Sequence, residues 1–169
     1  MTSRQLLLIR HAKAERHGEV DIERRLAKRG RADAAAIGRW LTEHGLIPDR
    51  IVVSPATRAR ETWQLAADAA GVTAKPVVDE RIYRNTVDDL LQTAAQTPRG
   101  VQTLAIVGHN PSMEDLAIAL DDGTGDAAAR TELTSNYPTG GVAVFAVGAD
   151  WSGLGAGSGT LTGFGVPRG

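Results

Sequence analysis

The chain has 169 residues, the size of one domain and enough to bury a sizeable core. Hydrophobic residues make up 42% and charged residues 23%, so the composition excludes global disorder. The formal net charge of −1 argues against nucleic acid or an acidic membrane as a partner, although it permits a local basic pocket. Because cysteine is absent, disulfides, thiolate zinc sites and cysteine nucleophiles are excluded.

No targeting or membrane segment stands out in the sequence. Residues 1–8 lack the long apolar run of a signal peptide, and no segment reaches the roughly 18 apolar residues of a membrane span. We therefore expect a cytoplasmic protein with no membrane partner. We treat residues 1–169 as one domain with a core at about 4–148. The glycine-rich segment 149–169 is expected to be irregular or to form a loose hairpin.

Short apolar runs alternate with longer helical patterns, which is typical of an α/β fold. The predicted strands cover residues 5–9, 51–53, 76–78, 103–107 and 141–147. The predicted helices lie around 36–41, from Ser54-Pro55 to Gly71, over 87–95, and from Asn110-Pro111 onward, with Ser54 as a cap and each proline at the first helical position. We predict a three-layer α/β/α sandwich with helices on both faces of a mostly parallel sheet. The late strand at 142–147 is the candidate for an antiparallel one.

Three of the predicted strands lead into residues suited to phosphate chemistry. Arg10 and His11 follow the first strand, Arg58 comes shortly after the second, and His109 and Asn110 follow the fourth. In an open α/β sheet, ligands bind outside the carboxyl ends of the strands. If these strands are parallel neighbours, the two arginines and two histidines meet in one crevice. Two helix N-termini would point into the same crevice and add an anion-binding field.

These residue types fit a phosphate pocket. The planar guanidinium of arginine donates paired hydrogen bonds to phosphate at a fixed positive charge. One histidine can act as a nucleophile and form a phosphoenzyme, and a second can donate to the transferring oxygens. A cation in the first turn of a helix is electrostatically unfavourable, which suggests that Arg58 is held there for an anion.

Other charged residues have simpler interpretations. Arg16, Arg24, Arg25, Arg29 and Arg31 interleave with acidic residues, so we expect them to form a solvated face rather than a nucleic-acid patch. A metal site is the competing interpretation of two histidines near carboxylates. However, the chain lacks the spacing of a His-x-x-x-His motif, and the neighbouring arginines would repel a dication. We therefore expect neither a metal nor a cofactor.

The three motifs resemble those of the histidine phosphatase superfamily, whose fold is the phosphoglycerate-mutase-like one. Leu-Ile-Arg-His-Ala at 8–12 is similar to the Arg-His-Gly box of the family. The segment 54–62 is similar to its second arginine box, and Val-Gly-His-Asn-Pro at 107–111 to its second histidine box. The short chain and the Tyr-Pro-Thr-Gly segment at 137–140 are most similar to the SixA-type phosphohistidine phosphatases.

The resemblance implies a role for each residue of the crevice. His11 would be the phosphorylated nucleophile, and Arg10, Arg58 and His109 would hold the phosphoryl group. We add Asn110 to the expected phosphate-binding set because it belongs to the second histidine box.

The general acid is less clearly defined by the motifs. Glu80 resembles the mutase glutamate that protonates the leaving oxygen, and it follows the third predicted strand, from which it could reach the crevice. SixA-type relatives often lack a clear acid, and a labile P–N bond needs less assistance.

In two places the chain departs from the family. Ala12 stands where the superfamily usually has glycine. Ala27 stands where relatives often carry Thr or Ser, so the next helix should lack an N-terminal cap.

The resemblance therefore implies a metal-independent phosphatase that works through a phosphohistidine intermediate on His11. The stretch between Arg58 and His109 leaves little room for an inserted lid, and an open pocket suits phosphohistidine presented on a protein. A broad small-molecule phosphomonoesterase is the enzymatic alternative. A non-catalytic phosphate-binding module is the alternative from another class, and the two retained histidines argue against it.

Overall fold

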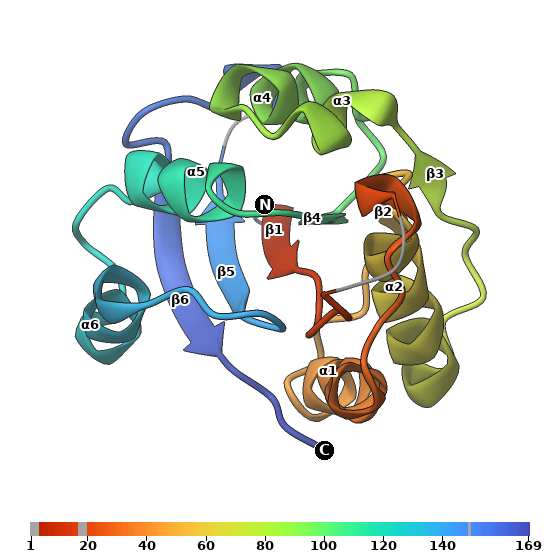
Figure 1. Ribbon diagram of the computed structural model, residues 1–169. Helices are drawn as coiled ribbons and strands as arrows, with labels where there is room; N and C mark the ends of the chain where they lie inside the picture. Colours follow the sequence, from red (N-terminus) through yellow and green to blue (C-terminus); the bar gives the residue numbers. More distant parts are fainter. Residues whose placement is uncertain (1–3, 17–19, 149) are drawn as a thin grey trace.

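The computed structural model describes residues 4–16, 20–148 and 150–169. Residues 1–3 of the segment 1–8 considered above and residue 149 of the glycine-rich segment lie outside these ranges. The sheet comprises β1 (Arg4–Arg10), β2 (Arg50–Val53), β3 (Val77–Val78), β4 (Thr103–Gly108), β5 (Val142–Val147) and β6 (Gly159–Gly165). The α-helices are α1 (Lys28–Glu43), α2 (Thr57–Ala70), α3 (Glu80–Arg84), α4 (Val87–Ala95), α5 (Ser112–Leu120) and α6 (Ala127–Ser135). Two short 3-10 helices, η1 (Asp21–Glu23) and η2 (Trp151–Gly153), complete the elements (Figure 1).

The strands form one six-stranded sheet in the order β3-β2-β4-β1-β5-β6. Strands β3, β2, β4 and β1 are parallel to one another, as predicted. Strand β5 runs antiparallel to β1, which confirms the prediction for residues 142–147. Because β2, β4 and β1 are parallel neighbours, their carboxyl ends lie at one edge of the sheet, and the motif residues follow directly from that edge.

Helices cover both faces of the sheet, so the predicted three-layer α/β/α architecture is confirmed (Figure 1). Side chains of a strand point alternately to opposite faces. Leu7 and Ile9 of β1 therefore pack with α1 and α2 around the buried Trp63. Leu6 and Leu8 face the other way, into a cluster with residues of α4, α5 and α6. Each face of β1 is thus apolar, which explains its continuous hydrophobic run.

Two helix starts differ from the prediction. Helix α2 begins at Thr57 with Ala56 at the N-cap position, and α5 begins at Ser112 with Pro111 at the N-cap position. The predicted cap from Ser54 is therefore wrong. Its hydroxyl accepts a hydrogen bond from Ala56 N in a short turn and contacts a histidine instead. The local turn thus delays the helix by two residues and frees this hydroxyl for the site.

The glycine-rich segment is more ordered than expected. Its residues Gly159–Gly165 form β6, which pairs antiparallel with β5 from Val147↔Gly159 to Val142↔Gly165. Glycine is required at least at 165, because a Cβ there would lie 2.6 Å from the indole of Trp40. The small residues that suggested a loose hairpin therefore allow the edge strand to approach a neighbouring aromatic ring.

The start of α1 confirms the expected absence of a cap. Ala27 occupies the N-cap position and makes no side-chain hydrogen bond to the helix. Gly30, in the first turn, packs so closely that a Cβ would lie 2.0 Å from the carbonyl oxygen of Lys13. This contact holds the loop after His11 against α1. In the described ranges, no helix is both long enough and apolar enough to cross a membrane.

Candidate active site

A cavity of about 760 Å³ opens at the carboxyl ends of β1, β2 and β4. The strand register places the motifs together here, since His11 N donates to Gly108 O at 3.0 Å and Ser54 N donates to Val107 O at 3.1 Å. The structure brings five of the predicted site residues to the wall of this cavity: Arg10, His11, Arg58, His109 and Asn110.

His11 is the first residue after β1, and its ring is held in one orientation. Nδ1 lies 2.7 Å from Ala12 O, and because a carbonyl only accepts, this nitrogen carries the proton. The lone pair of the neutral ring is therefore on Nε2. Burial, together with the nearby positive charges of Arg58 and Arg10, lowers the pKa of His11 from 6.5 to about 4. The side chain is thus a neutral imidazole near pH 7, as a nucleophile requires.

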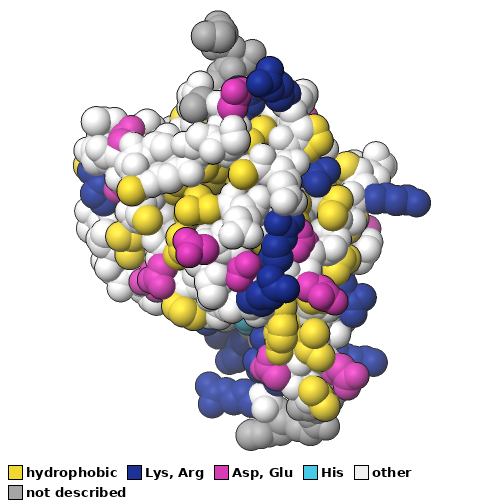
Figure 2. Space-filling model, turned by 90° about the horizontal axis from the view of Figure 1, so that it is seen from above, with side chains coloured by type: hydrophobic (Ala, Val, Ile, Leu, Met, Phe, Trp, Pro, Cys, Tyr) yellow, Lys and Arg dark blue, Asp and Glu magenta, His cyan; other side chains and the backbone are white. Residues whose placement is uncertain are grey.

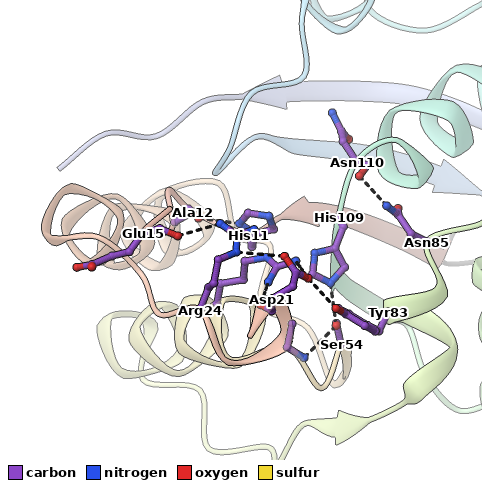
Figure 3. A network of polar contacts seen from close by, with 12 residues as sticks. His11, Ala12, Glu15, Asp21, Arg24, Ser54, Tyr83, Asn85, His109 and Asn110 are labelled. Carbon is purple, nitrogen blue, oxygen red and sulfur yellow. Dashed lines mark hydrogen bonds and ion pairs between the residues drawn. The ribbon is translucent and has the colours of Figure 1, made fainter. Parts of the chain in front are cut away.

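His109 lies beside His11, with the two ring centroids 5.3 Å apart. Its Nε2 is 2.8 Å from the hydroxyl of Ser54 (Figure 3). Since a hydroxyl can donate, this contact permits the neutral ring to carry its proton on Nδ1, which is buried and has no hydrogen-bond partner among the described residues. Burial, followed by the charges of His11 and Arg58, lowers the pKa of His109 to about 3. An unpaired buried donor next to a nucleophile is suited to a bound oxyanion.

Arg58 is the second residue of α2 and is almost fully buried. Asp21 of η1 holds it with two contacts: the carbonyl oxygen accepts from Nη1 at 2.7 Å, and a carboxylate oxygen accepts from Nη2 at 3.2 Å. The same carboxylate oxygen accepts from the Tyr83 hydroxyl at 2.6 Å. The bond from Tyr83, together with Arg58, lowers the pKa of Asp21 to about 2. Each Nη atom keeps a second hydrogen for a ligand.

Arg10 ends β1 and is positioned by the segment that precedes β5. Its Nη1 donates to Tyr137 O at 2.9 Å, and this carbonyl also accepts from Asn110 Nδ2 at 3.1 Å. Asn110 Nδ2 also donates to Glu114 Oε1 at 3.3 Å. Asn110 therefore lines the cavity as predicted, but its amide donors are used to join β1, α5 and this segment. The Tyr137 ring is buried, and its hydroxyl donates to Leu8 O.

The structure does not place Glu80 in the cavity, so this predicted position is wrong. Strand β3 has only two residues, and the chain enters α3 at once, with the Asp79 side chain capping the helix through Arg81 N. Glu80 is left exposed at the start of α3. From this segment, Tyr83 and Asn85 line the cavity instead. The ring of Tyr83 meets that of His109 edge-on at 5.7 Å.

The cavity is far more basic than the chain as a whole. Among the described residues, seven Lys or Arg side chains line it against two Asp. Besides Arg10 and Arg58, these cations are Lys13, Arg16, Arg24, Arg29 and Arg168. In Figure 2, a small patch of histidine surface near the lower edge has Lys and Arg side chains next to it. Arg16 and Arg29 are exposed, as the prediction of a solvated face requires, and together with Arg24 they also line the cavity.

The sequence offered one overlooked signal for these basic residues. Lys13 and Arg16 follow His11 within five positions, so the strand end that delivers His11 also delivers them. Arg24 also lines the cavity, and its Nη1 donates a hydrogen bond to Glu15 O at 2.9 Å (Figure 3). Arg168 is far away in sequence, and only the pairing of β6 with β5 brings its segment back to the site. Across the ranges described, no group of three or more His, Cys, Asp or Glu side chains comes together to hold a metal ion.

The buried neutral histidines should make the protein sensitive to mild acid. Their pKa values are about 4 and 3 in the folded protein and near 6.5 when unfolded, so the unfolded chain binds more protons between these values. The stabilisation is complete above pH 6.5. It falls by up to about 1.4 kcal/mol per pH unit for each histidine as the pH drops below that value. Denaturant titrations at pH 7, 6 and 5 should show this slope in the free energy of unfolding.

The double variant His11→Gln/His109→Gln should flatten this dependence between pH 6.5 and 5. The exposed His44 lies away from the cavity, and His44→Gln is the matched control that should retain the slope. An unchanged slope in the double variant would show that other groups cause the acid sensitivity.

Comparisons with known proteins agree with the geometry. The model of the histidine phosphatase superfamily (branch 1) matches residues 6–83. An uncharacterised protein of Mycobacterium tuberculosis is 37% identical over 162 residues, which cover 95% of this chain and 100% of the relative. A candidate phosphohistidine phosphatase SixA from Agrobacterium tumefaciens is 30% identical, with a TM-score of 0.81 over 98% of this chain and 99% of that chain. Another candidate SixA, from Nakamurella multipartitia, is 29% identical, with a TM-score of 0.85 over 98% and 96%.

Proposed function

Because this chain belongs to the histidine phosphatase superfamily, we propose that it hydrolyses phosphohistidine on a protein substrate through a covalent intermediate on His11. One observation carries the proposal above all others. The Nδ1–H of the neutral ring is bound to Ala12 O, which leaves the Nε2 lone pair as the reactive atom of a buried imidazole. Two arginines and a second histidine surround that ring in a basic cavity.

The first step transfers the phosphoryl group to His11. Its Nε2 lone pair attacks phosphorus in line, the P–N bond to the substrate imidazole breaks, and the leaving nitrogen takes a proton from solvent. Arg10, Arg58 and His109 donate to the equatorial oxygens, where negative charge accumulates in the transition state. Preorganised donors stabilise this charge without having to reorient as it develops.

The second step returns the enzyme to its starting form. Water attacks phosphorus, the bond to Nε2 of His11 breaks, and phosphate is released with the proton balance closed by solvent. No step in this scheme needs a metal ion or a side-chain acid. Glu80 is exposed outside the cavity, so the scheme has no side-chain acid to protonate a leaving group. This favours phosphohistidine as the substrate, because an imidazole leaves more readily than an alkoxide.

The two candidate SixA phosphatases support phosphohistidine as the substrate, since the chain matches almost their entire length at 29% and 30% identity. The segment between Arg58 and His109 is taken up by α2, β3, α3, α4 and β4. Little chain remains for an inserted lid over the cavity. The second candidate function is a broad phosphomonoesterase, which is favoured by a cavity large enough to hold a small phosphorylated molecule.

A turnover panel tests the proposal. We expect a histidine-phosphorylated protein domain to be dephosphorylated with a kcat/KM at least 10²-fold above that for alkyl phosphomonoesters, because only the P–N bond breaks without a side-chain acid; a general acid contributes roughly 10²–10⁴. Rates should be the same in EDTA. Comparable rates on alkyl esters would favour the phosphomonoesterase, and a loss of activity in EDTA that a divalent cation restores would contradict the metal-independent mechanism.

A further inference from the structure

We propose that Arg168 and Arg29, both held by the buried carboxylate of Asp33, form a second anion subsite beside the phosphoryl site. The substrate would then carry another negatively charged group near the phosphoryl group that is transferred. This inference rests on the proposed phosphatase function and narrows its substrate class. The anion can come from an acidic side chain next to the phosphorylated residue or from a second phosphate of a small molecule.

Asp33 is the centre of the subsite. It lies in α1 and is only 3% exposed, yet it lines the cavity. Its Oδ2 is 3.5 Å from Arg168 Nη1 and 3.9 Å from Arg29 Nε, and its Oδ1 accepts from Gly169 N at 3.1 Å. A charged side chain is rarely buried unless it is paired, and here the carboxylate pairs with two arginines that line the cavity.

Arg168 lies close to the backbone of His11. Its Nη1 donates to Thr139 O at 3.1 Å, and a Cβ on Gly140 would lie 3.1 Å from the same nitrogen. Gly140 N in turn donates to His11 O at 2.9 Å. The guanidinium is therefore separated from the His11 backbone by a single glycine. An anion bound to Arg168 would thus lie in the same cavity as the phosphoryl group that is transferred to His11.

The charge balance leaves this cluster able to bind an anion. Two arginine side chains share the one side-chain carboxylate of Asp33, so the side chains of the cluster carry a net positive charge, and Lys13 lines the same cavity. Arg29 contacts Asp33 through Nε and is 69% exposed, so its terminal nitrogens remain accessible to a ligand. A guanidinium offers carboxylate or phosphate two parallel hydrogen bonds in this arrangement.

The test measures binding, so that it does not depend on turnover. The first pair of ligands is a peptide with a stable phosphonate analogue of phosphohistidine flanked by Asp and Glu, and the same peptide with Asn and Gln. The second pair is a hexose bisphosphate and the corresponding hexose monophosphate. Titration calorimetry of the full chain should give about tenfold tighter binding for the more acidic member of at least one pair, the size of a charge-assisted contact. The pair that shows the difference identifies the source of the anion.

In the Arg168→Gln variant, the two members of that pair should bind with nearly equal affinity, while Arg168→Lys should retain part of the preference for the more acidic member. Arg99→Gln is the matched control, since Arg99 is 89% exposed, does not line the cavity and precedes β4 at the opposite edge of the sheet. It should keep the full preference. Equal affinities within both pairs, or a preference that survives in Arg168→Gln, would overturn the subsite. Failure of turnover with the binding preference intact would instead count against the proposed function.

Discussion

Replacement of His11 by alanine is expected to reduce turnover of every phosphorylated substrate below detection and to abolish the phosphoenzyme. The reason is geometric: among the residues described around the cavity, His11 combines an unprotonated ring nitrogen with a position between Arg10 and Arg58. His109 cannot replace it, because its Nε2 is engaged by Ser54 and its ring is placed to donate. Rapid quenching with radiolabelled substrate, followed by acid and base treatment, should detect a phosphoramidate that is labile in acid and stable in base.

The matched control for this prediction is Glu80→Gln. Glu80 is exposed and does not line the cavity, so its variant should form the phosphoenzyme at the rate of the native protein. Circular dichroism and thermal unfolding show whether His11→Ala remains folded. A folded His11→Ala protein that still formed a phosphoenzyme would disprove the assignment of the nucleophile. A large loss in Glu80→Gln would reinstate a role for this carboxylate.

The part of the site that the sequence predicts is the part that follows directly from buried strands. A continuous apolar run identifies β1, and parallel pairing then puts Arg10 and His11 at the same edge as His109. These positions depend on local pattern and on one general rule of α/β sheets. They need no knowledge of how the loops fold.

The residues that the sequence did not predict depend on contacts between distant segments. Asp21 reaches Arg58 through a single turn of 3-10 helix, for which no hydrophobic period exists. Arg168 reaches the cavity only because β6 pairs with β5 and Asp33 then holds it. The predicted position of Glu80 was wrong for a related reason: the two-residue β3 ends early, and α3 begins with Glu80 exposed. Short elements and long-range ion pairs have no sequence period from which they could be predicted.

The second large effect is expected at His109. The variant His109→Ala should lower kcat by roughly 10²–10³, the loss seen when one preorganised donor to a developing oxyanion is removed. The ring is 5.3 Å from that of His11 and has an unpaired Nδ1, so it is placed to donate to the phosphoryl oxygens as charge builds up. Because Arg10 and Arg58 remain, the affinity for inorganic phosphate should change by only a few-fold. Steady-state kinetics and a phosphate titration separate the two effects.

Ser54→Ala distinguishes a donor from a merely structural ring. Ser54 contacts His109 Nε2 at 2.8 Å and contributes no atom to the cavity lining, so its removal should release the ring orientation without removing the donor. We expect a smaller loss in kcat than in His109→Ala, with the double variant no slower than His109→Ala alone, since both changes act through one ring. If the losses of the two single variants multiplied in the double variant, Ser54 would act independently of His109. If His109→Ala lost phosphate affinity as strongly as kcat, the residue would bind the ground state and the transition state equally, and its role in stabilising the transition state would be excluded.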